Sequence, residues 1–283
     1  MIYIGVTGWG DHDTLYPPNQ KSRDKLKVYA GHFPVVEVDS SFYAIPAENT
    51  ALKWLEDTPD GFSFVIKAYS AMTGHKRTDI PFESKDEMYD AFLSFLEPFA
   101  GREKLAMVLF QFPPWFDAAK PHVEILRDIK RRMGSIPVAL EFRNRTWFTD
   151  AYYKKTLEFM HKESWIHSVV DEPDAGVKSI PTVLKATDRE KTLVRMHGRN
   201  RHGWNGAAKG QNWRDVRYLY RYNKTELLEW KEKLFALEKQ SGDVYVVFNN
   251  NSGGDAADNA KMMIELLGVS YTELAPRQLD LFE

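Results

Sequence analysis

Short apolar runs alternate with longer amphipathic stretches along most of the chain. The apolar runs are rich in β-branched and aromatic residues and carry almost no charge, a pattern typical of strands that are covered on both faces. We expect strands at residues 2–7, 35–38, 63–66, 105–110, 136–141, 165–170, 193–197 and 244–248. Strands of this kind form parallel sheets, because only crossover connections bring helices onto both faces.

The stretches between most of these runs have helical periodicity. Ser84 and Glu87 have the spacing of a capping box that opens a helix reaching about residue 99. Further helices are expected at residues 121–133, 150–163, 225–240 and 255–267, with Gly268 as the C-cap of the last one.

Eight strands that alternate with helices predict an α/β fold, a TIM-barrel-like (β/α)8 parallel barrel in a single domain over residues 1–274. One connection does not fit this pattern. Residues 172–191 contain Pro173 and Pro181 and show no long helical period. A barrel with an irregular sixth connection and a doubly wound sheet therefore both remain open.

The composition narrows the class of protein. The 283 residues are 43% apolar with a formal net charge of −2, which is ordinary for a globular protein. The absence of cysteine excludes disulfides and thiolate chemistry. No signal peptide or membrane-spanning run is recognisable, so we expect a cytoplasmic protein without membrane partners.

Polar or ionisable side chains stand at or just beyond the end of every predicted strand. In a barrel these ends meet at one mouth, so we expect a polar ligand-binding site there. The candidates are Trp9, Glu37, Asp39, Tyr43, Lys67, Gln111, Glu141, Arg143, Asp171, Arg195, His197, Asn249 and Asn250.

Several of these residues lie in motifs that resemble a known family. The motifs are Gly8-Trp9, Tyr29…Phe33…Glu37-Val38-Asp39-Ser40-Ser41-Phe42-Tyr43, Phe64…Lys67, Gln111-Phe112-Pro113, Glu141-Phe142-Arg143, Arg195…His197-Gly198 and Phe248-Asn249-Asn250. In this combination they resemble the YecE-like proteins, domain of unknown function family 72, over nearly the whole chain. The resemblance implies a TIM-barrel-like fold and no established activity.

The candidate residues of the mouth suggest two kinds of chemistry. His197 or Glu141 could act as an acid–base group, with Asp171 or Glu37 orienting it. Alternatively, Glu141, Asp171 and His197 end consecutive strands and offer ligands that suit a divalent metal ion. A third interpretation is purely structural, with Glu141 and Arg143 as an ion pair that braces the mouth.

A basic and aromatic segment follows the seventh predicted strand. It contains Arg195, Arg199, Arg201, Trp204, Lys209, Trp213, Arg214, Arg217, Tyr218, Tyr220, Arg221 and Tyr222, against the single acid Asp215. Cations bind phosphate and aromatic rings stack on bases, so we expect Arg199, Arg201, Trp204 and Lys209 to contact phosphate or nucleic acid. Tyr218 and Tyr222, four residues apart, are instead expected in the core of the next helix.

Residues 275–283 are expected to form a flexible tail that follows the barrel. Within it, Gln278, Leu279, Asp280, Leu281 and Phe282 resemble the peptide by which many bacterial replication and repair proteins bind the DNA sliding clamp. An apolar hook that packs on the protein's own body is the alternative. Taken together, the polar mouth and the tail leave three functions open. The protein is a hydrolase of phosphate esters or phosphodiesters, a non-catalytic nucleic-acid-binding module, or an enzyme that acts on small phosphorylated metabolites.

Overall fold

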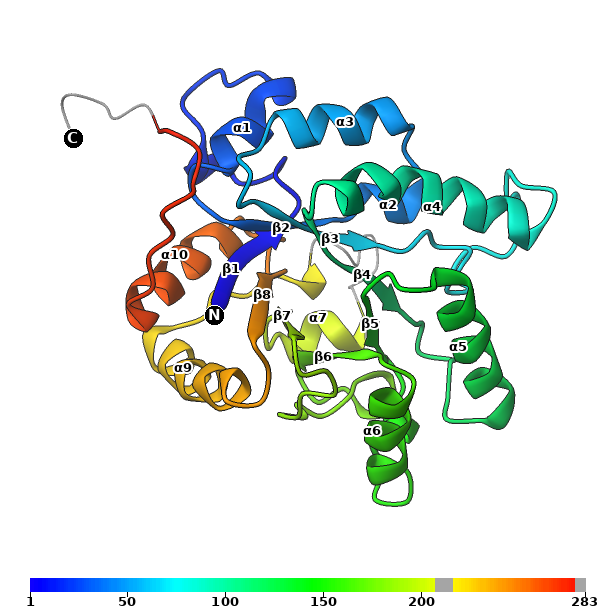
Figure 1. Cartoon of the computed structure of the whole chain (residues 1–283). Helices are drawn as coiled ribbons and strands as arrows, with labels where there is room; N and C mark the ends of the chain where they lie inside the picture. Colours follow the sequence, from blue (N-terminus) through cyan, green and yellow to red (C-terminus); the bar gives the residue numbers. More distant parts are fainter. Residues whose placement is uncertain (207–215, 278–283) are drawn as a thin grey trace.

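The computed structural model describes residues 1–206 and 216–277, and in it eight parallel strands close into a barrel (Figure 1). The strands are β1 (Ile2–Thr7), β2 (Val35–Val38), β3 (Ser63–Lys67), β4 (Leu105–Gln111), β5 (Val138–Glu141), β6 (Ile166–Asp171), β7 (Lys191–Met196) and β8 (Asp243–Phe248). Each strand pairs with the next, and β8 pairs with β1 through the register of Ile2 with Val244. This closure confirms the predicted barrel and excludes the doubly wound sheet.

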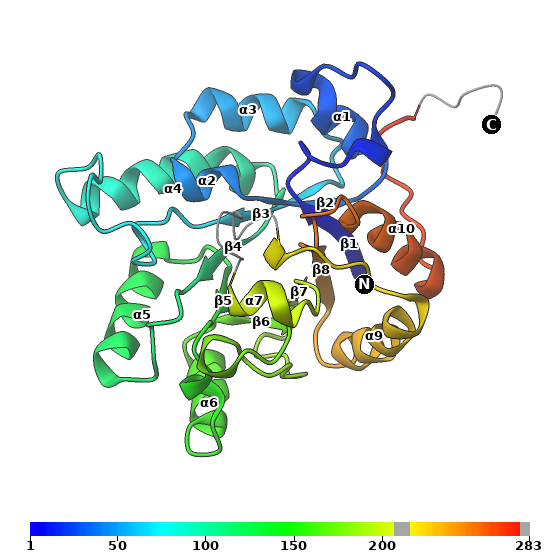
Figure 2. The same cartoon turned by 180° about the vertical axis from the view of Figure 1, so that it is seen from behind.

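Helices surround the barrel in both views (Figures 1 and 2). They are α1 (Lys25–Tyr29), α2 (Ser40–Tyr43), α3 (Glu48–Glu56), α4 (Lys85–Gly101), α5 (Lys120–Met133), α6 (Tyr153–Lys162), α7 (Arg201–Asn205), α9 (Lys224–Glu238) and α10 (Ala256–Leu267). Gly268 ends α10 with a φ of 68°, the left-handed conformation expected of a glycine C-cap.

The capping box predicted at Ser84 is only half formed. The hydroxyl of Ser84 accepts a hydrogen bond from the backbone of Glu87, as expected. The side chain of Glu87, however, accepts from the backbone of Glu83 rather than from that of Ser84. The helix therefore begins where the sequence predicts, with a shifted second contact.

The connection between β6 and β7 has no long helix, as its two prolines suggest; only a short turn of 3-10 helix, Gly176–Lys178, occurs. Instead, hydrogen bonds from threonine side chains hold this connection against the outside of β6. Thr182 donates to the carbonyl of Val170, and Thr187 bridges the backbone of Trp165 and His167. The barrel thus stays covered on this side without a helix.

Two apolar clusters separate the inside of the barrel from its outer layer. One contains residues such as Val35, Val65, Leu109 and Val247, spaced so that they share the inner face of their strands. The larger cluster joins the outer faces of the strands to the helices. Side chains alternate along a strand. The residue two positions beyond each residue of the inner cluster, toward the carboxyl end of the strand, therefore also points into the barrel.

Residues 271–277 run back along the body of the protein. The hydroxyl of Tyr271 donates to the carbonyl of Ile2, and the backbone of Ala275 donates to that of Ala30. Among the described residues, no helix is long and apolar enough to cross a membrane.

Candidate active site at the barrel mouth

The alternation of side chains brings six strand-end residues onto the inner face at the mouth. Each lies two positions beyond an inward apolar or small residue, as Glu37 lies beyond Val35 and Arg195 beyond Leu193. The six are Thr7, Glu37, Lys67, Gln111, Glu141 and Arg195. The parallel register places Thr7 beside Glu37 and Gln111 beside Glu141, so polar side chains gather in one layer.

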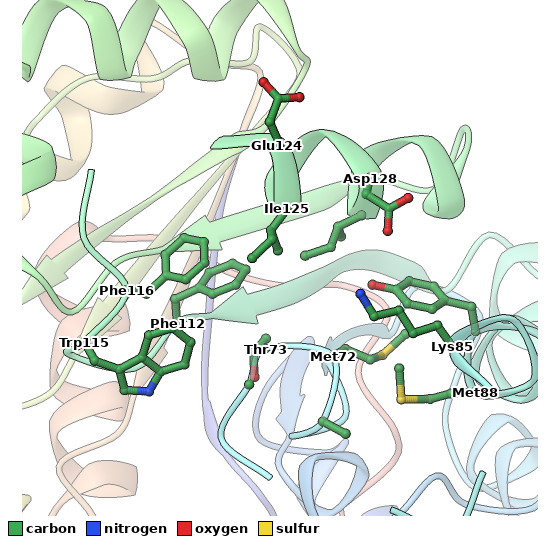
Figure 3. Close-up of a pocket in the computed structure, with 14 residues that line it drawn as sticks. Met72, Thr73, Lys85, Met88, Phe112, Trp115, Phe116, Glu124, Ile125 and Asp128 are labelled. Atoms are coloured by element: carbon green, nitrogen blue, oxygen red, sulfur yellow. The ribbon is translucent and has the colours of Figure 1, made fainter. Parts of the chain in front are cut away.

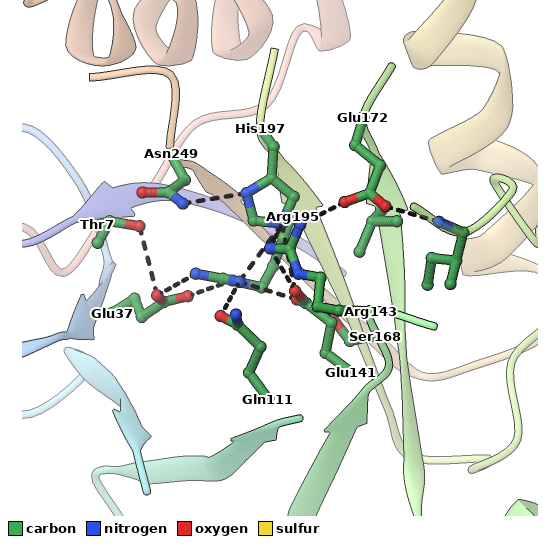
Figure 4. A network of polar contacts seen from close by, with 12 residues as sticks. Thr7, Glu37, Gln111, Glu141, Arg143, Ser168, Glu172, Arg195, His197 and Asn249 are labelled. Atoms are coloured by element: carbon green, nitrogen blue, oxygen red, sulfur yellow. Dashed lines mark hydrogen bonds and ion pairs between the residues drawn. The ribbon is translucent and has the colours of Figure 1, made fainter. Parts of the chain in front are cut away.

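Arg195 is the centre of this layer (Figure 4). Its guanidinium donates to both carboxylate oxygens of Glu37, at 2.7 and 2.5 Å. It also donates to Glu141 at 2.9 Å and to the side-chain oxygen of Gln111 at 3.3 Å. Since Arg195, Glu37 and Glu141 are all fully buried, these contacts replace water around three buried charges.

Arg143 forms the second half of the network. It lies two residues beyond Glu141 and pairs with that carboxylate at 2.7 Å. It also donates to Glu172, which in turn accepts from the backbone of Ile180 at 2.7 Å. A third contact, 2.9 Å from Nη2 of Arg143 to Nε2 of His197, brings an imidazole into the network. The other ring nitrogen of His197 lies 3.0 Å from the side-chain amide of Asn249.

Burial and charge set the protonation of these groups. Burial opposes ionisation of Glu141, but the guanidiniums of Arg143 and Arg195 hold its pKa well below the ordinary value. Burial, reinforced by the same two arginines, lowers the pKa of His197 far below its usual range, so the imidazole is neutral. Burial raises the pKa of Glu172 to about 7, although Arg143 acts in the opposite direction. Among these groups, Glu172 is therefore the one that exchanges a proton near neutral pH.

A cover formed by α7 and residues 216–219 lies against the mouth, and Figure 2 shows α7 in front of the barrel. The ring centre of Trp204 is 5.1 Å from the guanidinium of Arg143 and 3.9 Å from that of Arg217. Tyr218 approaches His197, with ring centroids 5.9 Å apart. Trp204 is only 8% exposed, so the cover shields the network from solvent.

Asn200 and Gly203 hold the two parts of the cover together. The side-chain amide of Asn200 donates to the carbonyls of Val216 and Leu219, and its oxygen accepts from Gly203. A Cβ on Gly203 would lie 2.2 Å from the carbonyl oxygen of Val216, so only glycine allows this approach.

The rim of the mouth carries a cation beside aromatic rings. Nζ of Lys67 lies 3.1 Å from Asp39 and 4.7 Å from the ring centre of Phe42. Burial opposes the charge on Lys67, but Asp39, Glu37 and Tyr218 together leave the lysine pKa raised. Tyr43 is exposed, whereas Trp9 is partly buried against Trp54.

Two predicted mouth residues, together with Arg199 of the basic segment, lie elsewhere. Asp171 and Asn250 have the outward parity of their strands, so they face the helical layer. Asp171 pairs with Arg199 at 2.9 Å, and Asn250 donates to Asn259 of α10. Arg199 also reaches Glu226 of α9, so it braces the outer layer instead of facing the mouth.

The predicted metal ligands do not converge. Asp171 faces away from His197, and Glu141 is already occupied by two guanidiniums and by the hydroxyl of Ser168. Within residues 1–206 and 216–277, no three His, Asp or Glu side chains are arranged to hold a metal ion. The hypothesis of a site built from Glu141, Asp171 and His197 is corrected accordingly.

Only part of the basic and aromatic segment reaches the mouth. Trp204 and Tyr218 reach it, so Tyr218 does not join the core of α9 as predicted, while Tyr222 is buried as predicted. Arg201 is exposed on α7. Lys209, Trp213, Arg214 and Asp215 lie outside the described residues, as do Gln278, Leu279, Asp280, Leu281 and Phe282.

The end of β6 in the sequence pattern does not single out Glu172. It stands one residue beyond that strand, in a connection whose only sequence signature is the lack of a helical period. Ser168 points into the barrel, and by alternation Val170 and Glu172 point the same way. This alternation is the sequence signal that identifies Glu172 as a mouth residue.

A separate cavity of about 380 Å³ lies between α4, α5 and the loops after β3 and β4 (Figure 3). Its walls are mainly apolar, with Met72, Met88, Phe112 and Phe116 among them. Trp115 stands at its edge, 44% exposed, with the guanidinium of Arg77 4.3 Å from its ring centre. The cavity is outside the barrel wall, because Phe112 follows the inward Gln111.

Comparison with known proteins identifies the family. Residues 3–280 match the family described as "Protein of unknown function DUF72". The UPF0759 protein YunF of Bacillus subtilis is 62% identical over the full length of both chains, and YecE of Escherichia coli K12 is 24% identical over 199 residues, covering 70% of this chain and 69% of YecE.

Solved structures agree with this assignment. A DUF72 protein from Enterococcus faecalis superposes with a TM-score of 0.92 at 36% identity, over 99% of this chain and all of the other. A DUF72 protein from Thermotoga maritima gives 0.80 at 28% identity, over 95% of this chain and all of the other. The chain is therefore a member of the DUF72, or UPF0759, family.

Proposed function

We propose that the protein binds a phosphate-bearing ligand at the barrel mouth, with single-stranded nucleic acid as the ligand that the mouth suits best. The observation that carries this proposal is the ring of Trp204 beside the guanidiniums of Arg143 and Arg217. Guanidiniums bind phosphate oxygens, and aromatic rings stack on bases regardless of sequence. Lys67 with Phe42 repeats this combination at the rim.

The mouth also has a group suited to proton transfer. Glu172 holds or releases a proton near neutral pH, whereas Glu141 is fixed as a carboxylate between two arginines. If the ligand is turned over, Glu172 is the acid–base group of a phosphate-ester or phosphodiester hydrolysis. Loss of turnover in Glu172→Gln with binding retained separates an enzyme from a binding module.

Recruitment to the DNA sliding clamp is the second part of the proposal. It rests on the resemblance of residues 278–282 to the clamp-binding peptide. The peptide follows Arg277, whose side chain lies against Gly31 and His32 on the body of the protein. A clamp-bound protein would be held close to DNA, so this part agrees with a nucleic-acid ligand.

Equilibrium binding of a short labelled single strand tests the proposal, measured by fluorescence anisotropy at several salt concentrations. We expect binding that weakens with salt, and a slope reduced by about 0.7 for each phosphate contact removed. Arg217→Gln should weaken binding, whereas Arg131→Gln, which removes an exposed cation of α5, should not. An Arg217→Gln variant that binds like wild type, or a wild type without affinity for any single strand, would contradict the proposal.

A further inference from the structure

We propose that the mouth recognises a terminal phosphate, held by Arg143 and Trp204, and so binds the end of a strand or a nucleoside monophosphate rather than the interior of a strand. This inference rests on the proposed function and narrows its ligand. It concerns the same site, but it can fail while the proposed function stands.

Two buried N–H groups of the mouth carry the inference. Nε of Arg143 and Nε1 of Trp204 have no hydrogen-bond partner among the described residues, although the two side chains are 1% and 8% exposed. Buried donors in native proteins are almost always hydrogen-bonded, because leaving one without an acceptor is costly. Both side chains meet at the same place, with the Arg143 guanidinium 5.1 Å from the Trp204 ring centre.

Both Nη atoms of Arg143 already have partners. Its Nη1 contacts Glu172, and its Nη2 contacts Glu141 and His197. These partners fix the plane of the guanidinium, so the direction of Nε is set before any ligand arrives. A site that is ordered in advance binds an oxyanion without the cost of arranging its donors.

The charge around these donors favours an anion. Lys67, Arg143, Arg195 and Arg217 face the carboxylates of Glu37, Asp39 and Glu141, together with Glu172. Burial raises the pKa of Glu172 to about 7, so near neutral pH this acid carries less than a full negative charge against the four cations. Burial, together with the charges of Lys67 and Arg143, lowers the pKa of the nearby His75 to about 4, so His75 is neutral there.

Enclosure distinguishes a terminal phosphate from an internal one. An internal phosphodiester continues into the chain on both sides and needs two exits from its site. Arg143 and His197 at the floor and Trp204 in the cover are all buried, which suits a group attached on one side only. A terminal phosphate also carries close to two negative charges at neutral pH, against one for a phosphodiester, and so gains more from an excess of cations.

Trp204→Phe isolates the proposed contact. Phenylalanine keeps an aromatic ring beside Arg143 and Arg217 but removes the indole N–H. Trp115→Phe is the matched control, because Trp115 lies at the separate cavity and is 44% exposed. Arg143→Lys is a second variant, which keeps the charge and removes Nε. Thermal unfolding of each variant shows whether it is folded.

The experiment compares strands of one sequence that end in 5′-phosphate, 3′-phosphate or hydroxyl groups only, with a nucleoside 5′-monophosphate as competitor. We expect at least one phosphorylated end to bind about tenfold tighter or more than the hydroxyl strand. Trp204→Phe should remove this preference, and Trp115→Phe should keep it. Arg143→Lys, where folded, should behave as Trp204→Phe does.

Each of the other possible results tests a different part of the proposal. Equal binding of all three strands overturns the terminal-phosphate inference and leaves the proposed function standing. A preference that survives Trp204→Phe overturns the assignment to this contact. Binding of the monophosphate without binding of any strand supports the inference and removes nucleic acid from the proposed function. No binding of any probe overturns both.

Discussion

Arg195 and Glu37, 158 residues apart in sequence, form a fully buried two-point ion pair across the mouth of the barrel. The same guanidinium reaches Glu141, so one cation neutralises two carboxylates. This arrangement explains how acidic residues can lie inside the barrel next to an apolar layer.

Removing Arg195 is expected to destabilise the protein strongly. Arg195→Met leaves Glu37 without its cation and Glu141 with only Arg143, and a buried charge without a partner costs about 3–5 kcal/mol. Urea unfolding measures the difference. The exposed Arg131→Met should change stability by less than about 0.5 kcal/mol. Similar losses in the two variants would mean that the buried pair has no special role.

The pH dependence of stability should report on Glu172. Its pKa rises from 4.5 in the unfolded chain to about 7 in the folded protein, so between these values the native state binds the proton more tightly. Stability from this group is therefore present below about pH 4.5 and is lost as the pH rises through 7, by about 3 kcal/mol in total.

Glu172→Gln removes this titration. The free energy of unfolding of wild type and variant can be measured at about pH 4 and about pH 8. Relative to wild type, the variant should be more stable at the higher pH than at the lower one, by up to about 3 kcal/mol. Parallel stability profiles for the two proteins would show that Glu172 does not carry the raised pKa.

The cover should depend on Gly203. In Gly203→Ala the new methyl group would lie 2.2 Å from the carbonyl oxygen of Val216, so α7 must move away from residues 216–219. We expect a loss of about 1–3 kcal/mol in thermal or urea unfolding, together with weaker binding of single strands. Gly101→Ala is the control, since a Cβ there meets no atom within 4 Å. Full stability and affinity in Gly203→Ala would argue against a cover held by close packing.

Clamp recruitment should depend on residues 278–282. We expect the full chain to bind the bacterial sliding clamp, and a chain ending at Arg277 to lose this binding. The shortened chain keeps the contacts of Tyr271 and Ala275 with the body, so its stability should not change. Leu281→Ala with Phe282→Ala is expected to match the shortened chain, because these side chains are expected to fill apolar pockets. Equal clamp binding by all three proteins, or binding by none, would exclude this role for the peptide.

The strands and the closed barrel could be predicted from the sequence because each strand is apolar on both faces. Strand ends such as Thr7 and Glu141 lie where the pattern places them. The alternation of side chains decides which strand-end residues face the site. Asp171 is the last residue of β6 but faces outward, whereas Glu172 beyond it faces Arg143. Reading each strand in steps of two would have made this distinction.

The arrangement of the cover could not be read from the sequence. Trp204 and Tyr218 reach Arg143 and His197 through contacts between distant segments, and periodicity carries no information about such contacts. The tyrosine spacing suggested a helix, but α9 begins only at Lys224. The contacts of Asn200 with Val216 decide the local path instead.

The most direct test of the account is to locate a bound strand on the protein. A single strand carrying a photoreactive base can be crosslinked, and the attached residue identified by mass spectrometry. The account predicts attachment to Trp204 or Tyr218 at the mouth, competed by unlabelled strand. Attachment at Trp115 beside the cavity of Figure 3, or at the opposite end of the barrel, would contradict the claim that the mouth is the ligand site.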